Sequence, residues 1–350
     1  MIDTIKIQNF RCFESIQLSD CRRVNLIVGR NASGKTALLE AIFLASGASP
    51  ELGLRIKGWR GEGAIVVSAE QSSYESAWKD LFYKFNQTQA ISIQFVGSAG
   101  FGRSLRILYE LAPAFHLPLG QDVREIQTIT PVVFVYTDEN GKEYKVSPIV
   151  AQGALTIGAV ALPPMNSTFF PTQSPVPVQQ YVGFYSALSK QKKESVVVKL
   201  LRTEFPFIRD ISAEMGSSGL WVLYASLDEL PEKIPVTLLS SGVTKLLFIL
   251  LAIAMQPNGI LLIDEIENGF YFDRLQSIWS LILRFASEYN VQIFASTHSR
   301  ECLEAAADVG KNQRDKFGII RTVKVKGTVE IRQFDGRRFV DAMDEGIEIR

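Results

Sequence analysis

Cysteine and histidine are scarce in this chain, whose 350 residues include three cysteines and two histidines. Cys12, Cys21 and Cys302 are too few and too widely separated for a disulfide framework or a thiolate metal cluster. We interpret them as small buried residues of a protein from a reducing compartment. The composition therefore excludes a disulfide-stapled scaffold and a cysteine-ligated metal centre.

The chain also lacks a net charge and a long apolar run. Lys and Arg together number 37, as do Asp and Glu, so no global positive field favours nucleic acid or an acidic membrane, and any such contact must come from a local patch. The longest apolar run, Leu246–Met255, is too short to span a bilayer and predicts a buried helix. Residues Met1–Ile7 alternate like a strand and lack the pattern of a signal peptide. We expect a cytoplasmic protein without membrane contact.

A phosphate-binding pattern lies near the N-terminus. Gly29, Gly34, Lys35 and Thr36 fill the fixed positions of G-x-x-x-x-G-K-[ST], directly after the apolar run Val24–Val28. Glycines let the backbone curl into a nest of N–H donors, and the following helix directs its positive end at the phosphates. Lys35 would neutralise the β- and γ-phosphates of ATP, and the Thr36 hydroxyl would ligate Mg²⁺. The candidate nucleotide-binding residues of the loop are Arg30, Asn31, Ala32, Ser33, Gly34, Lys35 and Thr36.

A second acidic element follows a buried strand predicted over Ile260–Ile263. Asp264 and Glu265 end this strand, and two adjacent carboxylates there are costly unless a ligand compensates them. Asp264 would hold Mg²⁺ through water, and Glu265 would orient or deprotonate the attacking water. The alternative is a pair of solvated acids that open the turn Glu267–Gly269.

Two further segments are candidates for contact with the nucleotide. Ser240 and Gly242 precede the apolar helix, and a helix N-terminus binds anions, although Ser240 could equally be an ordinary N-cap. His298 follows the strand predicted over Val291–Ala295, at the sheet edge where ligands collect in open α/β sheets. We interpret His298 as a γ-phosphate sensor, against the alternative of a structural histidine.

The chain divides into an α/β core and an inserted part. We predict a core over residues 1–48 and 236–350, and a β-rich and helical lobe over 49–235, where short alternating runs are separated by turn residues. The proline-rich stretch from Pro163 to Pro177 predicts an irregular surface connection. A helical run is expected over Tyr181–Phe205, and strands over Gly318–Phe339. His116, in the predicted lobe, receives no role.

The order of these motifs resembles that of ABC-type ATPases of the RecF, SMC and OLD group, and most closely the bacterial AAA family ATPases of the AAA_15/AAA_21 type. The motifs that carry this resemblance are Phe10-Arg11, Gly29–Thr36, Leu239–Gly242, Leu261–Gly269 and Ser296–Ser299. The resemblance implies a P-loop NTPase of the ABC-head fold, with ATP held between two copies and the Ser240–Val243 segment of one closing the site of the other. It also implies roles for Asn31 near the γ-phosphate and for Arg11 near the nucleotide. Gln179 and Gln180 are candidates for the metal-sensing glutamine.

Three functions stay open at this point. The first is a Mg²⁺-dependent, dimerising ATPase switch that works on or with DNA, in repair or antiphage defence. The second is an ATPase that serves a separate nuclease or effector protein, since no D-x-D or histidine cluster follows His298. The third is the motor subunit of a membrane transporter, against which the Phe10-Arg11 element and the long β-rich insertion argue. The absence of an N-K-x-D motif disfavours a GTPase.

Overall fold

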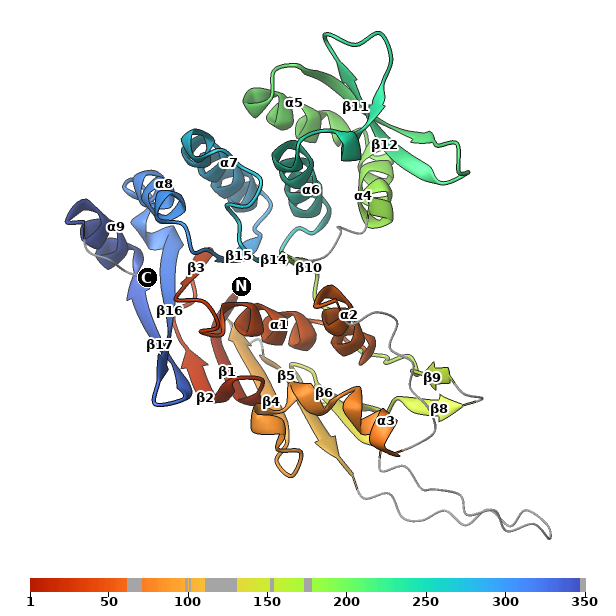
Figure 1. The fold of residues 1–350 in the computed structure, drawn as a ribbon, viewed down its shortest axis with the longest axis vertical. Coiled ribbons are helices and arrows are strands. Elements are labelled where there is room, and N and C mark those ends of the chain that lie inside the picture. The colour runs from red at the N-terminus through yellow and green to blue at the C-terminus, as the bar shows by residue number, and fades with distance from the viewer. Residues whose placement is uncertain are drawn as a thin grey trace.

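The computed structural model describes residues 1–61, 71–97, 100, 102–110, 131–151, 154–172 and 178–346. Within these residues, two six-stranded sheets enclose one helix, and further helices cover the outer face of one sheet (Figure 1). One of the short alternating runs of the predicted lobe, Ile65–Val67, and His116 lie outside the described residues.

The first sheet is parallel over most of its width and carries the central strand β3 (Val24–Val28). Its order is β10-β14-β15-β3-β16-β17, and all neighbours are parallel except the last pair. The other strands are β10 (Ser167–Phe170), β14 (Ile260–Ile263), β15 (Gln292–Ser296), β16 (Phe317–Val325) and β17 (Thr328–Asp335). Every residue of β3, β14 and β15 is buried, as expected for parallel strands covered on both faces. The carboxyl ends of these three strands therefore meet at one edge.

The second sheet is antiparallel, in the order β2-β1-β4-β5-β6-β7. Its strands are β1 (Ile2–Phe10), β2 (Phe13–Leu18), β4 (Ile91–Gly97), β5 (Gly102–Tyr109), β6 (Val132–Thr137) and β7 (Glu143–Val146). Helix α1 (Lys35–Ser46) lies between the two sheets, and every residue from Ala37 to Ser46 is buried (Figure 1). Helix α2 (Glu51–Trp59) contacts α1, and it is followed along the chain by α3 (Gln71–Ser76) and the 3-10 turns η1 (Lys79–Leu81) and η2 (Tyr83–Phe85).

Helices α6 (Ser241–Met255), α7 (Leu275–Glu288) and α8 (Arg300–Gly310) cover the parallel sheet on the face opposite α1 (Figure 1). Helices α4 (Val178–Lys190) and α5 (Glu194–Glu204) and the hairpin β11–β12 pack near α6, and α9 (Gly336–Asp344) packs against α8. The hairpin strands are β11 (Ile208–Met215) and β12 (Trp221–Leu227). The smaller elements are β8 (Ile149–Ala151), β9 (Ala154–Thr156), β13 (Ile234–Pro235), η4 (Val236–Leu238), η5 (Phe272–Arg274) and η6 (Arg314–Lys316). Two hydrophobic clusters result, one on each face of the parallel sheet.

Three local predictions were wrong. The proline-rich stretch contains β10, which is hydrogen-bonded beside β14 because its Thr168-Phe169-Phe170 core suits a buried strand. The helical run 181–205 is two helices, since the backbone at Lys192 turns left-handed with φ +58°. The chain after β17 forms α9, capped by Asp335, where a strand was expected.

Both sheets contain strands from the predicted core and strands from the predicted inserted lobe. Strand β4, from the predicted lobe, pairs with β1, and β10 pairs with β14. Within the described residues, these parts of 49–235 thus share sheets with strands from 1–48 and 236–350, and the domain boundaries stay a prediction.

Candidate nucleotide site

The loop between β3 and α1 has the backbone that its glycines require. Gly29 has φ +147°, and a Cβ there would lie 2.4 Å from Thr322 Oγ1. Gly34 has φ +100°, and a Cβ there would lie 2.9 Å from Cys12 Sγ. A buried hydrogen bond of 2.6 Å joins Ser33 Oγ to Thr322 Oγ1 of β16. Neither glycine position can accept a side chain without moving its neighbours.

The start of α1 is arranged to receive an anion. Gly34 is the N-cap and makes no side-chain cap hydrogen bond, and the first helical turn has no acidic residue. Lys35 Nζ bends back over the loop and donates to the carbonyls of Gly29 (2.8 Å) and Arg30 (3.2 Å). Burial lowers the pKa of Lys35, and the nearby carboxylates, first that of Asp264, oppose this shift. A helix N-terminus and an ammonium group therefore converge on one space.

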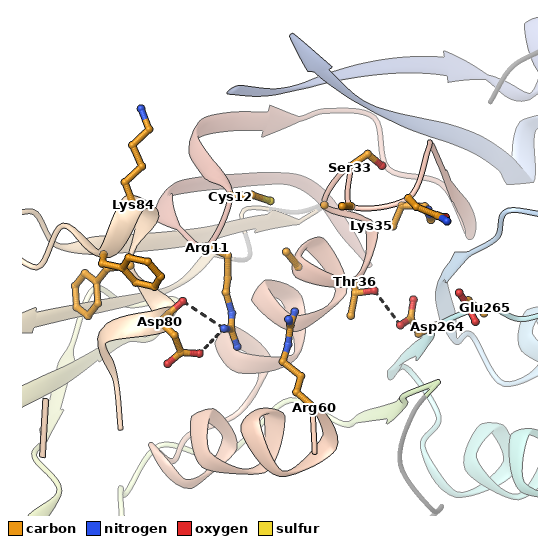
Figure 2. A pocket seen from close by; sticks show the side chains of 16 residues that line it. Arg11, Cys12, Ser33, Lys35, Thr36, Arg60, Asp80, Lys84, Asp264 and Glu265 are labelled. Carbon is orange, nitrogen blue, oxygen red and sulfur yellow. Dashed lines mark hydrogen bonds and ion pairs between the residues drawn. The ribbon is translucent and has the colours of Figure 1, made fainter. Parts of the chain in front are cut away.

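The two halves of the site meet at Thr36 and Asp264, whose side chains are 228 positions apart in the sequence. Thr36 Oγ1 donates to Asp264 Oδ2 at 3.0 Å (Figure 2). Ser296 Oγ donates to the other carboxylate oxygen at 2.5 Å, so Asp264 is held from helix α1 and from the end of strand β15. A hydroxyl and a carboxylate are a fitting protein ligand set for Mg²⁺, which keeps several waters and takes further oxygens from phosphates.

Glu265 follows in a left-handed conformation, with φ +48°. Its backbone N–H donates to Ser296 Oγ at 2.8 Å, and its Oε2 accepts from Asn268 Nδ2 at 2.7 Å. The side chain is 31% exposed and lines the same cavity as Lys35 and Thr36. The carboxylate is thus accessible and held in place, as a group that orients water must be.

His298 lies beside Glu265, as its place after β15 predicts. Its Nδ1 is 3.6 Å from Glu265 Oε1 and 3.1 Å from Glu267 Oε1. Glu267 Oε1 also accepts from the backbone N–H groups of His298 (2.9 Å) and Ser299 (3.2 Å). The sequence does not predict this anchoring role of Glu267, because the role depends on a contact between the turn after β14 and the turn after β15.

The cavity has a volume of about 590 Å³ and extends well beyond the phosphate loop. Figure 2 shows Lys35, Asp264 and Glu265 at one end and Lys84 at the other. Between them lies a charged network, in which buried Glu40 of α1 pairs with Arg11 (3.3 Å) and, bidentately, with Arg60 (2.7 and 2.9 Å). Arg11 also pairs with Asp80, and Lys57 pairs with the same carboxylate at 2.9 Å. The cavity walls also include Asn31, Ala32, Ser33, Gly34, Phe82 and Phe85.

Ser240 and Gly242 lie outside this cavity, at the start of α6. Ser240 is exposed and is the N-cap, since its Oγ accepts from the N–H of Val243 at 3.5 Å. Gly242 is buried against Gly269, and a Cβ on Gly242 would lie 2.3 Å from the Gly269 carbonyl oxygen. The side chain of Gln179 donates to the carbonyl of Trp221 at 3.1 Å, on β12.

A phosphate loop after the central strand β3, a histidine after its neighbour β15 and an Asp-Glu pair after the next strand, β14, define an ABC-type P-loop ATPase. The chain is an ATPase with an ABC-type head fold, and it is similar to proteins of the RecF and SMC group.

Comparisons with known proteins agree with this class. Residues 1–154 match the family model described as "AAA ATPase domain", and residues 167–304 match "AAA domain, putative AbiEii toxin, Type IV TA system". The chain is 24% identical over 336 residues to the "ATP/GTP phosphatase" of Helicobacter pylori, covering 87% of each protein. It is 49% identical over 43 residues to the "DNA replication and repair protein RecF" of Idiomarina loihiensis, which is 12% of each chain.

Among solved structures, the fold is similar to a "SmcHead bound to the C-winged helix domain of ScpA". The TM-score is 0.51 at 13% sequence identity, and the match covers 98% of this chain and 99% of the other. Among the described residues, no helix combines the length and apolar character needed to cross a membrane.

Proposed function

We propose that this protein is a Mg²⁺-dependent ATPase switch of the RecF/OLD type, in which two copies close on bound ATP. The observation that carries the proposal is the 3.0 Å hydrogen bond between Thr36 and Asp264, which joins the phosphate loop to the acidic strand end. Lys35 and the N–H groups of Arg30–Thr36 bind the phosphates. Bound Mg²⁺ supplies charge neutralisation at the transferring phosphoryl group.

The remaining side chains divide the chemistry between them. Glu265 orients the attacking water and accepts its proton, since it is accessible and lies beside the metal-binding carboxylate. His298 senses the γ-phosphate, because its ring lies at the same edge and is 51% exposed. Arg11 and Asn31 line the cavity where the rest of the nucleotide would lie.

The position of Ser240–Val243 supports the proposed dimerisation. The exposed Ser240 and the start of α6 form an anion-binding helix end, yet they are outside the cavity of their own chain. A nucleotide bound by a second copy would complete this contact. In this arrangement each site takes its phosphate loop from one copy and its Ser240–Val243 segment from the other.

We further propose that the switch is cytoplasmic and associates with DNA, in repair or antiphage defence. The short similarity to RecF supports DNA association, and a separate nuclease or effector is the alternative partner. Stimulation of ATP hydrolysis by DNA fragments, compared at low and high salt, tests this step, since contacts to phosphates weaken with salt.

The roles at the site are tested by two substitutions. Lys35→Ala should abolish ATP binding, whereas Glu265→Gln should keep binding and reduce turnover by about 100-fold or more, since it removes the acceptor and spares the phosphate contacts. Turnover and equilibrium binding are measured with both ATP and GTP, because the Helicobacter relative is named for both. Equal loss of ATP affinity in the two variants would contradict the division of roles.

The shared site is tested at Ser240 with two variants that both keep the helix cap. Asp and Asn cap helices as well as Ser does, but only Asp places an anion where a phosphate would approach. Ser240→Asp should therefore abolish ATP-dependent dimerisation and turnover, and Ser240→Asn should retain both. Wild-type turnover in Ser240→Asp that does not depend on protein concentration would show that one chain forms a complete site.

A further inference from the structure

Lys245 of α6 connects the start of that helix to the turn that carries Glu265. Its Nζ donates to the carbonyl oxygens of Glu265 (2.8 Å) and Asn268 (3.2 Å), and lies 5.8 Å from the centre of the Phe270 ring. The side chain is half-buried. Lys245 is three residues after Gly242, which is nearly one helical turn.

The turn that Lys245 contacts has an unfavourable backbone at its first residue. Glu265 has φ +48°, a conformation that a residue with a side chain rarely adopts without support. The Asn268 N–H donates to the Glu265 carbonyl at 3.1 Å, and the Asn268 side chain holds the Glu265 carboxylate at 2.7 Å. The ammonium group of Lys245 therefore binds the carbonyls of Glu265 and Asn268, the first and last residues of this turn. The backbone of the turn determines where the Glu265 side chain points.

The carboxylates that act on Lys245 belong to Asp264, Glu265 and Glu267, in or next to the turn that it contacts. Burial lowers the pKa of Lys245 to about 8, and Glu267, Cys302, Asp264 and Glu265 oppose this shift. Glu267 Oε1 anchors His298, whereas its Oε2 is buried and has no hydrogen-bond partner among the described residues. A cation is thus kept in a desolvated position next to the acidic turn, where an apolar side chain would cost less to bury.

The start of α6 has a second contact with this turn. The backbone of Gly242 packs so closely on Gly269 that an added Cβ would lie 2.3 Å from its carbonyl oxygen. A movement of the start of α6 would therefore reach Glu265 through two contacts. One is the packing of Gly242 on Gly269, and the other is the pair of hydrogen bonds that Lys245 donates.

We propose that Lys245 is a positioning residue that couples the Ser240–Val243 segment to hydrolysis in its own chain. Closure of a second copy's nucleotide on that segment fixes α6, and Lys245 then holds Glu265 and, through Glu267, His298 in the geometry needed for attack by water. This inference rests on the dimeric ATPase proposed above. The Ser240–Val243 segment of each copy then regulates the active site of its own chain and also forms part of the partner's site.

The test compares Lys245→Met, Lys245→Arg and a control, Lys199→Met, which removes an exposed ammonium group from α5. Lys245→Met should lower kcat by about 10- to 100-fold, the range expected when a catalytic group loses its position. KM, ATP affinity and ATP-dependent dimerisation should stay within about threefold of wild type, since the described contacts of the ammonium group are with Glu265, Asn268 and Phe270 and not with the phosphate loop. Lys245→Arg should recover most of the turnover, because it keeps a cationic donor.

Thermal unfolding is measured on each variant. If Lys245→Met does not fold, Lys245→Gln, which keeps a neutral donor, should fold and show the same loss of kcat with unchanged KM. Turnover in a folded Lys245→Met or Lys245→Gln protein equal to that of Lys199→Met would overturn the inference, as would a proportional loss of ATP affinity. Absence of turnover in the wild type would instead contradict the proposed function itself, so the two failures are distinct.

Discussion

Gly242→Ala should destabilise the protein although alanine favours helices. The added Cβ would lie 2.3 Å from the carbonyl oxygen of Gly269 and 3.2 Å from its carbonyl carbon, so the turn must move by about 1 Å to reach ordinary contact. Gly269 itself has φ +90° and belongs to the turn that also holds Glu265, which limits relaxation. Overpacking of this kind typically costs about 1–3 kcal/mol.

Gly183→Ala provides the matched control. Gly183 lies inside α4, and no described atom is within 4 Å of the position of its added Cβ. This change should stabilise the protein by about 0.5–1 kcal/mol, since it removes freedom from the unfolded chain without strain. Urea unfolding followed by tryptophan fluorescence should therefore place the two midpoints on opposite sides of the wild type with similar slopes. A Gly242→Ala protein as stable as Gly183→Ala would refute the packing argument.

Three further predictions concern the histidine of the site, a buried carboxylate beside the cavity and two buried thiols. His298→Ala should lower turnover far more than it weakens ADP binding, because ADP lacks the γ-phosphate; unchanged turnover in a folded variant would make the histidine structural. Glu40→Gln should lower the free energy of unfolding by about 2 kcal/mol, less than for a fully buried pair because the Arg60 side chain is 42% exposed; denaturant titration measures this, and a stable variant would contradict it. Burial raises the pKa of Cys21 and Cys302 to about 12, so neither thiol should react with a disulfide reagent at pH 8 until the protein is unfolded, and rapid native-state labelling of either would count against their burial.

The elements whose chemistry depends on short segments could be predicted from the sequence. The Gly29–Thr36 pattern and the acids after Ile260–Ile263 could be placed at one sheet edge, because parallel strands bring their carboxyl ends together. His298 could be placed at this edge for the same reason, and in the structure its Nδ1 lies 3.6 Å from Glu265 Oε1. Glycine spacing and strand ends are local signals, which is why one sequence was enough.

The contacts that support these groups could not be predicted in this way. Lys245 is the one charged residue of the apolar helix α6, and nothing in its neighbours indicates that its ammonium group binds the carbonyl of Glu265. Arg60 and Lys84, which form part of the cavity wall, belong to segments that follow α1 and carry no motif. Strand β10 was obscured by surrounding prolines, because burial against β14 is a tertiary effect that local turn signals do not report.

The position of β3 has a consequence for the order in which the chain can fold. Both of its neighbours, β15 and β16, are synthesised more than 250 residues later, and Thr322 of β16 supports the phosphate loop through Ser33. A nascent chain with the complete Gly29–Thr36 segment therefore has no sheet in which to hold it until most of the polypeptide has left the ribosome. Contacts this distant in sequence form slowly, and the growing chain must keep an apolar central strand unpaired meanwhile. Nucleotide binding should thus be acquired only near the end of synthesis, and a chain that ends before β16 should fail to bind ATP despite carrying every motif of the site.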